Sequence, residues 1–366
     1  MNLNMVILLV VVLIPLYIPI IFIPYWTRKT ESFGVTIPEE AYTRPDLKKM
    51  RQNYAIITAV LALVTSIVLF LTTDGQEENF IAILLSICIF AYLISSFIVY
   101  LFFHKQMKNI KSRYPEWTAK AHVVTINTQF RNQRIAYSNY WFIIPFAISL
   151  ITIVMTLVNY PQIPERFPMQ YNFSGDVTNW GTKSYRSVLL TPIMQIYLTL
   201  LFLLVNTIIS KAKQQVSAVN PEESLKQNII FRKRWSLFTI LMGTGLIIVL
   251  MLPQLSLMYP LSQQLLQYVV IGYVAVVCIA SIILSITTGQ GGSRITKTVV
   301  QNGQMIDRDD DRYWKLGMFY FNPNDPAIFL EKRFGIGWTN NWAHPLSWVF
   351  IIAVLALAIG LPILFE

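Results

Sequence analysis

The chain has 366 residues, of which 54% are hydrophobic and only 13% are charged. An average soluble domain is roughly 25% charged, so the composition excludes an ordinary soluble domain and indicates a membrane protein. The formal net charge of +10 does not indicate nucleic-acid binding, because the basic residues are confined to loops between apolar segments. We therefore expect membrane lipids, and no direct contact with nucleic acid, for these loops.

Apolar segments of about 18 to 24 residues recur along the chain, and each is long enough to cross a hydrocarbon core of about 30 Å as a helix. Eight such segments lie at residues 3–24, 54–72, 80–103, 140–158, 187–209, 235–252, 265–287 and 346–365. None carries Asp, Glu, Lys or Arg in its interior. The sequence therefore predicts an all-α membrane protein with eight transmembrane helices. We expect Pro15, Pro19 and Pro24 to kink or end the first one.

The basic residues predict the orientation. Loops 25–53, 104–139, 210–234 and 288–345 hold six, seven, six and seven Lys or Arg residues, and the other loops hold only Arg166, Lys183 and Arg186. Cytoplasmic loops of membrane proteins are enriched in Lys and Arg. We therefore expect a multi-pass protein of the cell membrane, with the four basic loops in the cytosol and both termini outside.

Two of the expected cytosolic loops look alike. "IPEEAYTRPDLKKMRQNYA" follows the first span and "NPEESLKQNIIFRKRWSLF" follows the fifth. Each has a Pro-Glu-Glu helix start, a basic cluster and an aromatic residue at the next span. This likeness favours a parallel repeat of four plus four helices, although chance placement of one tripeptide is an equal alternative. We divide the chain into a first four-helix membrane half at 1–158, a loop at 159–186, helices five to seven at 187–287, a cytosolic loop at 288–345 and the eighth helix at 346–366.

The expected external loop 159–186 contains "RFPMQYNFSGDVTNWGTKSYR". Its prolines favour an extended entry, its Asn and Gly residues suit turns, and Trp180 is a rigid aromatic anchor. One interpretation is an ordered connection with aromatics in the outer membrane interface. The other is an extracellular recognition surface, because loops on a rigid scaffold often carry binding function.

This loop resembles the signature of an uncharacterised bacterial membrane-domain family, which also occurs in SdpI-type immunity and signalling proteins. The matching residues are Pro164, Tyr171, Asn172, Gly175, Trp180, Gly181, Thr182 and Lys183. The family's usual histidine is Gln170 here, which argues against a metal or proton role at that position. "GQGGSRI", "FGVTIPEEAY" and the aromatic segment before the last span also resemble segments of such proteins. The resemblance implies recognition of an extracellular toxic peptide, with Pro164, Tyr171, Asn172, Gly175, Trp180, Gly181 and Lys183 as candidate ligand-binding residues.

The expected cytosolic loop 288–345 contains the chain's main non-helical segment. "WKLGMFYFN" and "AIFLEKRFG" are typical of strands, and "NPNDP" between them is typical of a turn, so we predict one small β-hairpin before the last helix. Its aromatic residues suit either an interfacial belt or a partner-binding surface. The glycines of "GQGGSRI" suit a flexible exit from the seventh span, with Arg294 on a lipid phosphate. Candidate contacts to lipid or to a cytosolic regulator are Gly291, Gly292, Arg294, Trp314, Tyr320, Lys332, Arg333 and Trp338.

Other polar groups give no catalytic or metal pattern. The acidic run "DRDDDR" at 307–312 lacks the spacing of a calcium loop, and we expect a solvated turn. His104, His122 and His344 are expected at the surface or interface, and none has zinc-ligand spacing. Cys88 and Cys278 lie in expected spans as small hydrophobic residues. We expect no metal, no cofactor and no enzymatic activity.

The expected spans offer only hydroxyls and amides such as Gln195 and Asn206, which suit hydrogen bonds between helices. Ion-coupled transporters and intramembrane enzymes usually keep charged residues there. These features favour a non-enzymatic immunity or sensor protein that recognises an extracellular or membrane-inserted peptide. The alternative is a transporter or permease for an amphipathic or lipidic substrate.

Overall fold

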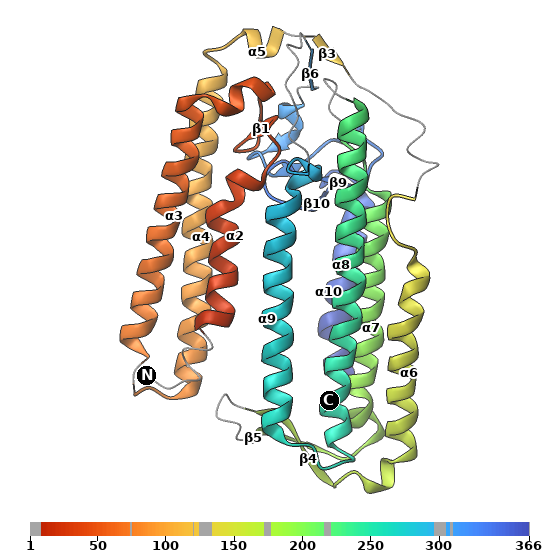
Figure 1. Cartoon of the computed structure of the whole chain (residues 1–366). Coiled ribbons are helices and arrows are strands. Elements are labelled where there is room, and N and C mark those ends of the chain that lie inside the picture. The colour runs from red at the N-terminus through yellow and green to blue at the C-terminus, as the bar shows by residue number, and fades with distance from the viewer. Residues whose placement is uncertain are drawn as a thin grey trace. The chain divides into compact units, whose positions relative to one another are not determined.

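The computed structural model describes residues 9–73, 75–119, 121–123, 134–171, 177–215, 221–295, 305–307 and 310–365. Among these, seven helices are long and apolar enough to cross a membrane, and a shorter apolar helix covers Val10–Trp26. The long helices are α3 (Pro45–Thr72), α4 (Glu78–Lys111), α6 (Ile143–Val158), α7 (Tyr185–Lys211), α8 (Pro221–Ser256), α9 (Gln263–Thr288) and α10 (Pro345–Phe365) (Figure 1). The prediction of a multi-pass all-α membrane protein is confirmed.

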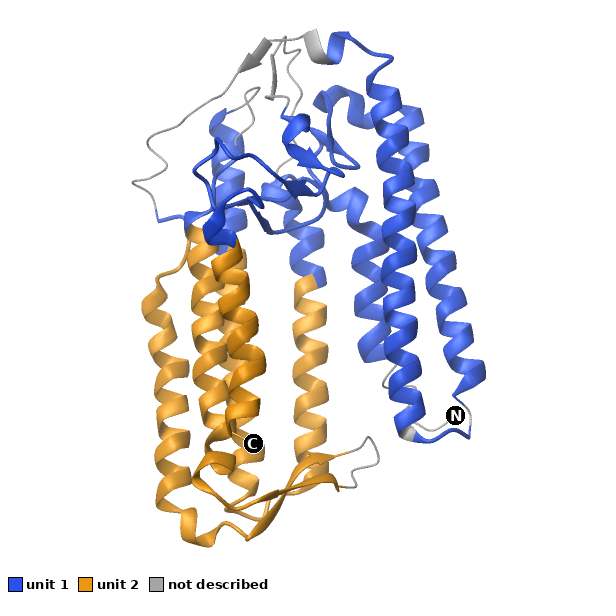
Figure 2. Ribbon diagram, turned by 180° about the vertical axis from the view of Figure 1, so that it is seen from behind, with its two compact units in different colours: residues 1–135, 211–233, 282–347 blue, residues 136–210, 234–281, 348–366 orange. Residues whose placement is uncertain are grey.

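The chain forms two compact units (Figure 2). Unit 1 comprises residues 1–135, 211–233 and 282–347, and unit 2 comprises residues 136–210, 234–281 and 348–366. In this division α6 belongs with α7 in unit 2, and the predicted boundary of the first membrane half at residue 158 stays a prediction. The parallel four-plus-four repeat stays a prediction.

The membrane helices of unit 1 are α3, α4 and the shorter α2 (Ile14–Trp26), which follows a π-helical turn at Leu9–Leu13. Pro19 and Pro24 lie inside α2, which remains helical to Trp26 rather than ending at a proline. A buried apolar cluster joins the three helices, and in it the rings of Tyr17 and Tyr92 meet edge to face at 4.6 Å.

The first Pro-Glu-Glu motif does not begin an α-helix. Glu39–Thr43 form a 3-10 turn, and α3 begins only at Pro45, because Arg44 precedes a proline and stays extended. The second motif behaves as predicted, since Pro221 is the first residue of α8 and Glu222 and Glu223 lie in its first turn.

Short antiparallel hairpins cover one end of the unit 1 helices. β1 (Glu31–Ser32) pairs with β2 (Val35–Thr36), β7 (Trp314–Lys315) with β8 (Phe319–Tyr320), and β9 (Phe329–Glu331) with β10 (Trp338–Asn340). A further pair, between β3 (Ala121–Val123) and β6 (Met305–Asp307), is parallel.

The prediction of a single hairpin in the segment before α10 is wrong, because each expected strand turns back on itself or pairs further along the chain. Leu316 and Gly317 have φ values of 53° and 70°, so "WKLGMFYF" makes a tight turn in its middle. The "NPNDP" turn is present, with the Asn324 N–H bonded to Asn322 Oδ1 at 3.0 Å, but it connects two hairpins.

Two of the hairpin turns meet on α4. A Cβ on Gly34 would lie 2.4 Å from the carbonyl oxygen of Gly317, so only glycine allows this approach. The Tyr100 hydroxyl donates to the Leu316 carbonyl at 2.9 Å, and Phe33 stacks on Phe103. His104, expected at the surface, is buried on α4, and its Nδ1 lies 2.7 Å from the Phe33 carbonyl oxygen.

Unit 2 is organised by buried polar contacts between α6, α7 and α8. Gln254 Nε2 donates to Thr156 Oγ1 at 3.0 Å and to the Val188 carbonyl at 2.9 Å. Gln195 Nε2 donates to the Ile247 carbonyl at 2.9 Å.

A third contact holds the other end of these helices, where Ser236 Oγ donates to Asn206 Oδ1 at 2.6 Å and Asn206 Nδ2 donates to Asn139 Oδ1 at 2.8 Å. The contact positions on α7 are residues 188, 195 and 206, spaced by seven and eleven. Both steps are close to whole turns of a helix, so one face of α7 carries all three polar contacts. The amides expected to join helices do so.

The two buried glutamines differ in a measurable way. Gln254→Leu leaves Thr156 and the Val188 carbonyl without their donor, and we expect a loss of about 1–2 kcal/mol in the free energy of unfolding. Gln195→Leu also removes Oε1, a buried acceptor with no partner among the described residues, so its cost is smaller. SDS titration of the purified chain checks the order; an equal or larger loss for Gln195→Leu contradicts it.

Candidate functional site

The segment with the recognised motif forms a β-hairpin in unit 2, between α6 and α7. β4 (Arg166–Tyr171) pairs with β5 (Val177–Thr182), with Phe167 opposite Gly181 and Pro168 opposite Trp180. The inner face packs on the helix ends, because Phe167 is buried against Ile163 and Val188. The hairpin could not be predicted from the sequence, because the turn-forming residues of the motif interrupt the alternation of inward and outward side chains.

The outer face of the hairpin is open. Trp180 is 56% exposed although it lies opposite Pro168, and Arg166 is also exposed. Gly181 is buried, and a Cβ on it would lie 2.7 Å from Met169 Sδ. The hairpin therefore combines a fixed inner face with a large aromatic side chain that is exposed on the outer face.

Aromatic and cation–π contacts hold the base of the hairpin in place. The rings of Tyr160 and Tyr185 stack at 4.2 Å with an interplanar angle of 9°, and Lys183 Nζ lies 5.0 Å from the centroid of the Tyr160 ring. The Lys183 ammonium also donates to the Pro161 carbonyl at 3.4 Å. Lys183 therefore helps to position the base of the hairpin, and its predicted contact with a ligand stays a prediction.

The remaining candidates in this motif are only partly described. Pro164 is exposed two residues before β4, and Tyr171 and Gln170, which replaces the family's histidine, are exposed on β4. Asn172 and Gly175 lie outside the described residues.

A second concentration of functional groups is buried in unit 1, around β9. We call it the β9 ion cluster; it consists of Arg28, Glu31, Lys111, Arg232, Asp310, Asp311, Glu331 and Arg333. Glu331 is the last residue of β9, and Arg333 follows it by two residues.

Glu331 is the anion at the centre of one half of this cluster. Its Oε1 accepts hydrogen bonds from Arg232 Nη2 and Asn228 Nδ2, each at 2.8 Å, and its Oε2 accepts one from Arg28. The side chains of Glu331 and Arg232 are both fully buried. The exit of α2 and the start of α8 are thus fixed to one carboxylate.

Arg333 is the cation at the centre of the other half. It forms ion pairs with Asp310 and Asp311, and Glu31 Oε1 lies 4.0 Å from its Nε. Lys111 Nζ, at the end of α4, lies 2.8 Å from Asp311 Oδ2. Burial alone would raise the pKa of Asp311, but the charges of Arg333 and Lys111 outweigh it and lower that pKa to about 2.

The cluster changes two interpretations. The acidic run is not a solvated turn at Asp310 and Asp311, because both pair with Arg333. Trp314, Tyr320 and Arg333, expected to contact lipid or a regulator, are 2%, 3% and 2% exposed, because they form the interior of the hairpins.

The residues Leu316, Phe319 and Phe321, which lie near Trp314 and Tyr320 in the sequence, have the exposed apolar side chains of this segment. Lys332 and Trp338 are half-buried, and burial lowers the pKa of Lys332.

The glycine-rich segment after α9 is packed rather than loose. The Gln290 side chain is buried and bonds to the turn of the last hairpin: Nε2 donates to the Lys332 and Gly337 carbonyls at 3.0 Å, and Oε1 accepts from the Gly337 N–H at 2.8 Å. A Cβ on Gly292 would lie 2.3 Å from the Gln227 carbonyl oxygen. Gly291 abuts Arg28, and Arg294 is exposed with its guanidinium donating to the Tyr25 carbonyl at 2.7 Å.

Four residues of this site could not be predicted from the sequence: Arg28, Arg232, Asn228 and Glu331. Basic residues beside membrane spans indicate orientation, and the partners of Arg28 and Arg232 lie far away in the sequence. The one available signal was the Glu-Lys-Arg triplet at 331–333 in an otherwise apolar strand, where period-two alternation places Glu331 and Arg333 together.

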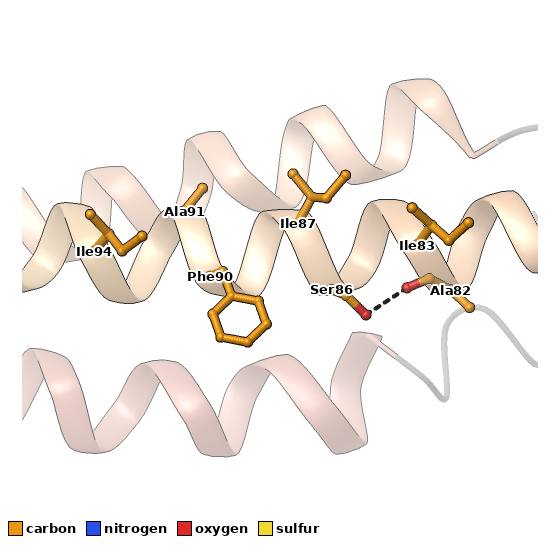
Figure 3. Close-up of a pocket in the computed structure, with 7 residues that line it drawn as sticks. All are labelled: Ala82, Ile83, Ser86, Ile87, Phe90, Ala91 and Ile94. Carbon is orange, nitrogen blue, oxygen red and sulfur yellow. Dashed lines mark hydrogen bonds between the residues drawn. The ribbon is translucent and has the colours of Figure 1, made fainter.

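A shallow hollow on α4 carries no comparable chemistry. Its lining comes from one face of the helix: Ala82, Ile83, Ser86, Ile87, Phe90, Ala91 and Ile94 (Figure 3). The only hydroxyl in it, that of Ser86, donates to the Ala82 carbonyl at 2.8 Å. The hollow is an apolar helix surface of the kind that faces lipid.

These features define a multi-pass membrane protein with an exposed hairpin in unit 2 and a buried ion cluster in unit 1. Two family models match parts of the chain. A domain of unknown function (DUF1648) matches residues 147–196, and a family of unknown function (DUF5808) matches residues 323–348. The first match spans the β4–β5 hairpin, and the second spans β9 and β10. No curated protein and no solved structure matches the chain.

Loss of the central anion should destabilise unit 1. Glu331→Gln leaves Arg232 buried without a full counter-charge, so we expect a loss of about 3–5 kcal/mol in the free energy of unfolding. Lys29→Ala is the control, because Lys29 is in an exposed pair with Glu39 at 3.6 Å and should change stability by less than about 1 kcal/mol. SDS titration measures both; equal losses contradict the central role of Glu331.

The lowered pKa of Asp311 predicts an acid dependence. A carboxylate whose folded pKa is below its ordinary value of 3.8 stabilises the fold fully above that value, and the contribution is lost as the pH falls through about 2. The rate of amide hydrogen exchange in β7–β9, corrected for intrinsic exchange, should not change with the protonation of Asp311 between pH 7 and pH 5. The rate should increase as the pH falls towards 2. Asp311→Asn should lack this acid step, and a step retained in that variant assigns it elsewhere.

Proposed function

We propose that this chain is a non-enzymatic membrane protein of the immunity or sensor kind, which recognises an extracellular or membrane-inserted peptide. The observation that carries the proposal is the β4–β5 hairpin, whose inner face is fixed by Phe167 and whose outer face presents Trp180. Its resemblance to the motif of SdpI-type immunity proteins supplies the class of ligand. The match of residues 147–196 to a domain model supports a conserved role for this part of the chain.

The distribution of charge supports the required orientation. The loops expected in the cytosol carry nearly all Lys and Arg residues, so β4–β5 lies outside the cell membrane in this proposal, as do both termini. The β9 ion cluster then lies in the cytosol. There the exposed Leu316, Phe319 and Phe321 offer an apolar surface for a regulator, next to a cluster whose rearrangement would alter that surface.

The alternative, a transporter for an amphipathic or lipidic substrate, is favoured by one observation. Gln195 Oε1 is buried in the membrane part of unit 2 and has no partner among the described residues, so it could accept a hydrogen bond from a passing substrate. Flux into proteoliposomes that is absent from empty vesicles, and reduced by Gln195→Leu, would favour this function over peptide recognition.

Trp180 should be the main contact to the peptide. We expect Trp180→Ala to lower protection of a peptide-sensitive bacillus by about 30-fold, because removal of a central aromatic anchor typically costs about 2 kcal/mol. Lys183→Ala should also lower protection, by loosening the hairpin base. The assay is the peptide dose that halves growth of cells expressing each variant.

Thr178→Ala is the matched control, since Thr178 is exposed on the same strand and lacks an aromatic ring. Expression and thermal stability of each variant are measured in parallel. Full protection by both Trp180→Ala and Lys183→Ala would remove the hairpin from the mechanism.

A further inference from the structure

The two edges of the β4–β5 hairpin differ in their hydrogen-bonding groups. At its base the Lys183 N–H donates to the Glu165 carbonyl at 2.9 Å, so this is a bonded pair of the ladder. In an antiparallel ladder bonded and non-bonded pairs alternate. The pairs Arg166–Thr182 and Pro168–Trp180 are therefore non-bonded, and their backbone groups point away from the hairpin.

The outer edge of β4 is blocked. Pro168 has no N–H to donate, and a proline at an outward-pointing position is a common way to close a strand edge. On β5, by contrast, Thr182 and Trp180 each have an N–H directed outward, and Trp180 also has a carbonyl. Among the described residues, no third strand pairs with either edge (Figure 1). The edge of β5 is thus open for a further strand.

The surroundings of this edge indicate the charge of a suitable partner. Arg166 and Arg186 are exposed near the base of the hairpin, and an exposed acidic residue among the described residues there is Glu165, which lies 3.8 Å from Lys183. The two arginines have no carboxylate partner within salt-bridge distance in the described structure, which favours a ligand with acidic groups. Trp180, on the outer face of the same strand, offers an apolar contact for alternate side chains of that ligand.

We propose that β5 binds an extended, acidic peptide by strand addition, with main-chain hydrogen bonds to Trp180 and Thr182 and ionic contacts to Arg166 and Arg186. This rests on the proposed function and specifies how its ligand is held. Main-chain bonds supply affinity that is largely independent of sequence, and the outward side chains select among peptides. A second copy of this chain is the other conceivable occupant, but it would bring Arg166 and Arg186 of both chains together.

The experiment uses the full chain in lipid nanodiscs and a fluorescent synthetic peptide of alternating valine and threonine that ends in two glutamates. We expect saturable binding. A peptide of the same sequence, N-methylated at alternate amides, should bind about tenfold more weakly, because it cannot complete the ladder. This comparison leaves the protein unaltered and so does not depend on the folding of a variant.

Variants of the protein test the edge itself. Thr182→Pro removes one outward N–H and should weaken binding of the acidic peptide about tenfold, whereas Thr182→Val keeps that N–H and should bind as the wild type does. The Thr182 carbonyl accepts from Ser187 Oγ at 2.6 Å, and a proline retains this carbonyl. Arg166→Ala should weaken the acidic peptide but not a neutral one ending in two glutamines.

Three results would overturn the inference: no saturable binding of the acidic peptide, equal binding of the methylated and unmethylated peptides, or pairing of two chains through β5 in place of peptide binding. The protection assay separates this from the proposed function. If Trp180→Ala loses protection while Thr182→Pro retains it, peptide recognition stands and strand addition fails. If wild-type chain gives no protection, the proposed function fails, whatever the synthetic peptide does.

Discussion

The fold of unit 1 depends on a buried carboxylate at the end of β9 and a buried guanidinium two residues after it. Glu331 pairs with Arg28 at the exit of α2 and with Arg232 near the start of α8. Arg333 pairs with Asp311, which also pairs with Lys111 at the end of α4. Buried ions are costly unless each is paired and hydrogen-bonded, so any displacement of one segment leaves charges without partners. The cluster therefore favours a single arrangement of the hairpins, because any other arrangement would leave some of its ion pairs unformed.

Unit 2 has no such cluster among its described residues and uses neutral groups instead. Its amides and hydroxyls are paired across helices at intervals close to whole turns, which holds α6, α7 and α8 without charge in the membrane. The β4–β5 hairpin is built on the ends of these helices through Phe167 and the Tyr160–Tyr185 stack. A fixed base of this kind allows Trp180 to stay exposed on an ordered strand.

The helices could be predicted from the sequence, because length and apolar composition alone determine what crosses lipid. The hairpins could not be placed well, since the decisive feature is a single residue such as Leu316 or Gly317 with positive φ, within a run that otherwise suits a strand. The ion cluster could not be predicted either, because Arg28 and Glu331 are 303 residues apart in the chain. At the hairpin, the sequence predicted a loop with Trp180 as an aromatic anchor, and the structure has two paired strands with Trp180 exposed and Lys183 beside the Tyr160 ring. The ligand contacts predicted for Trp180 and Lys183 stay predictions.

Pro168 has a consequence for how the molecule behaves at high density in a membrane. A ribbon with two open edges can recruit neighbours on both sides and extend into a fibre. Here Pro168 blocks the outer edge of β4. If two chains were to pair through β5, both outer edges of the resulting four-stranded sheet would be blocked β4 edges. Growth would stop at the pair, and the protein could display an open strand edge without seeding aggregation.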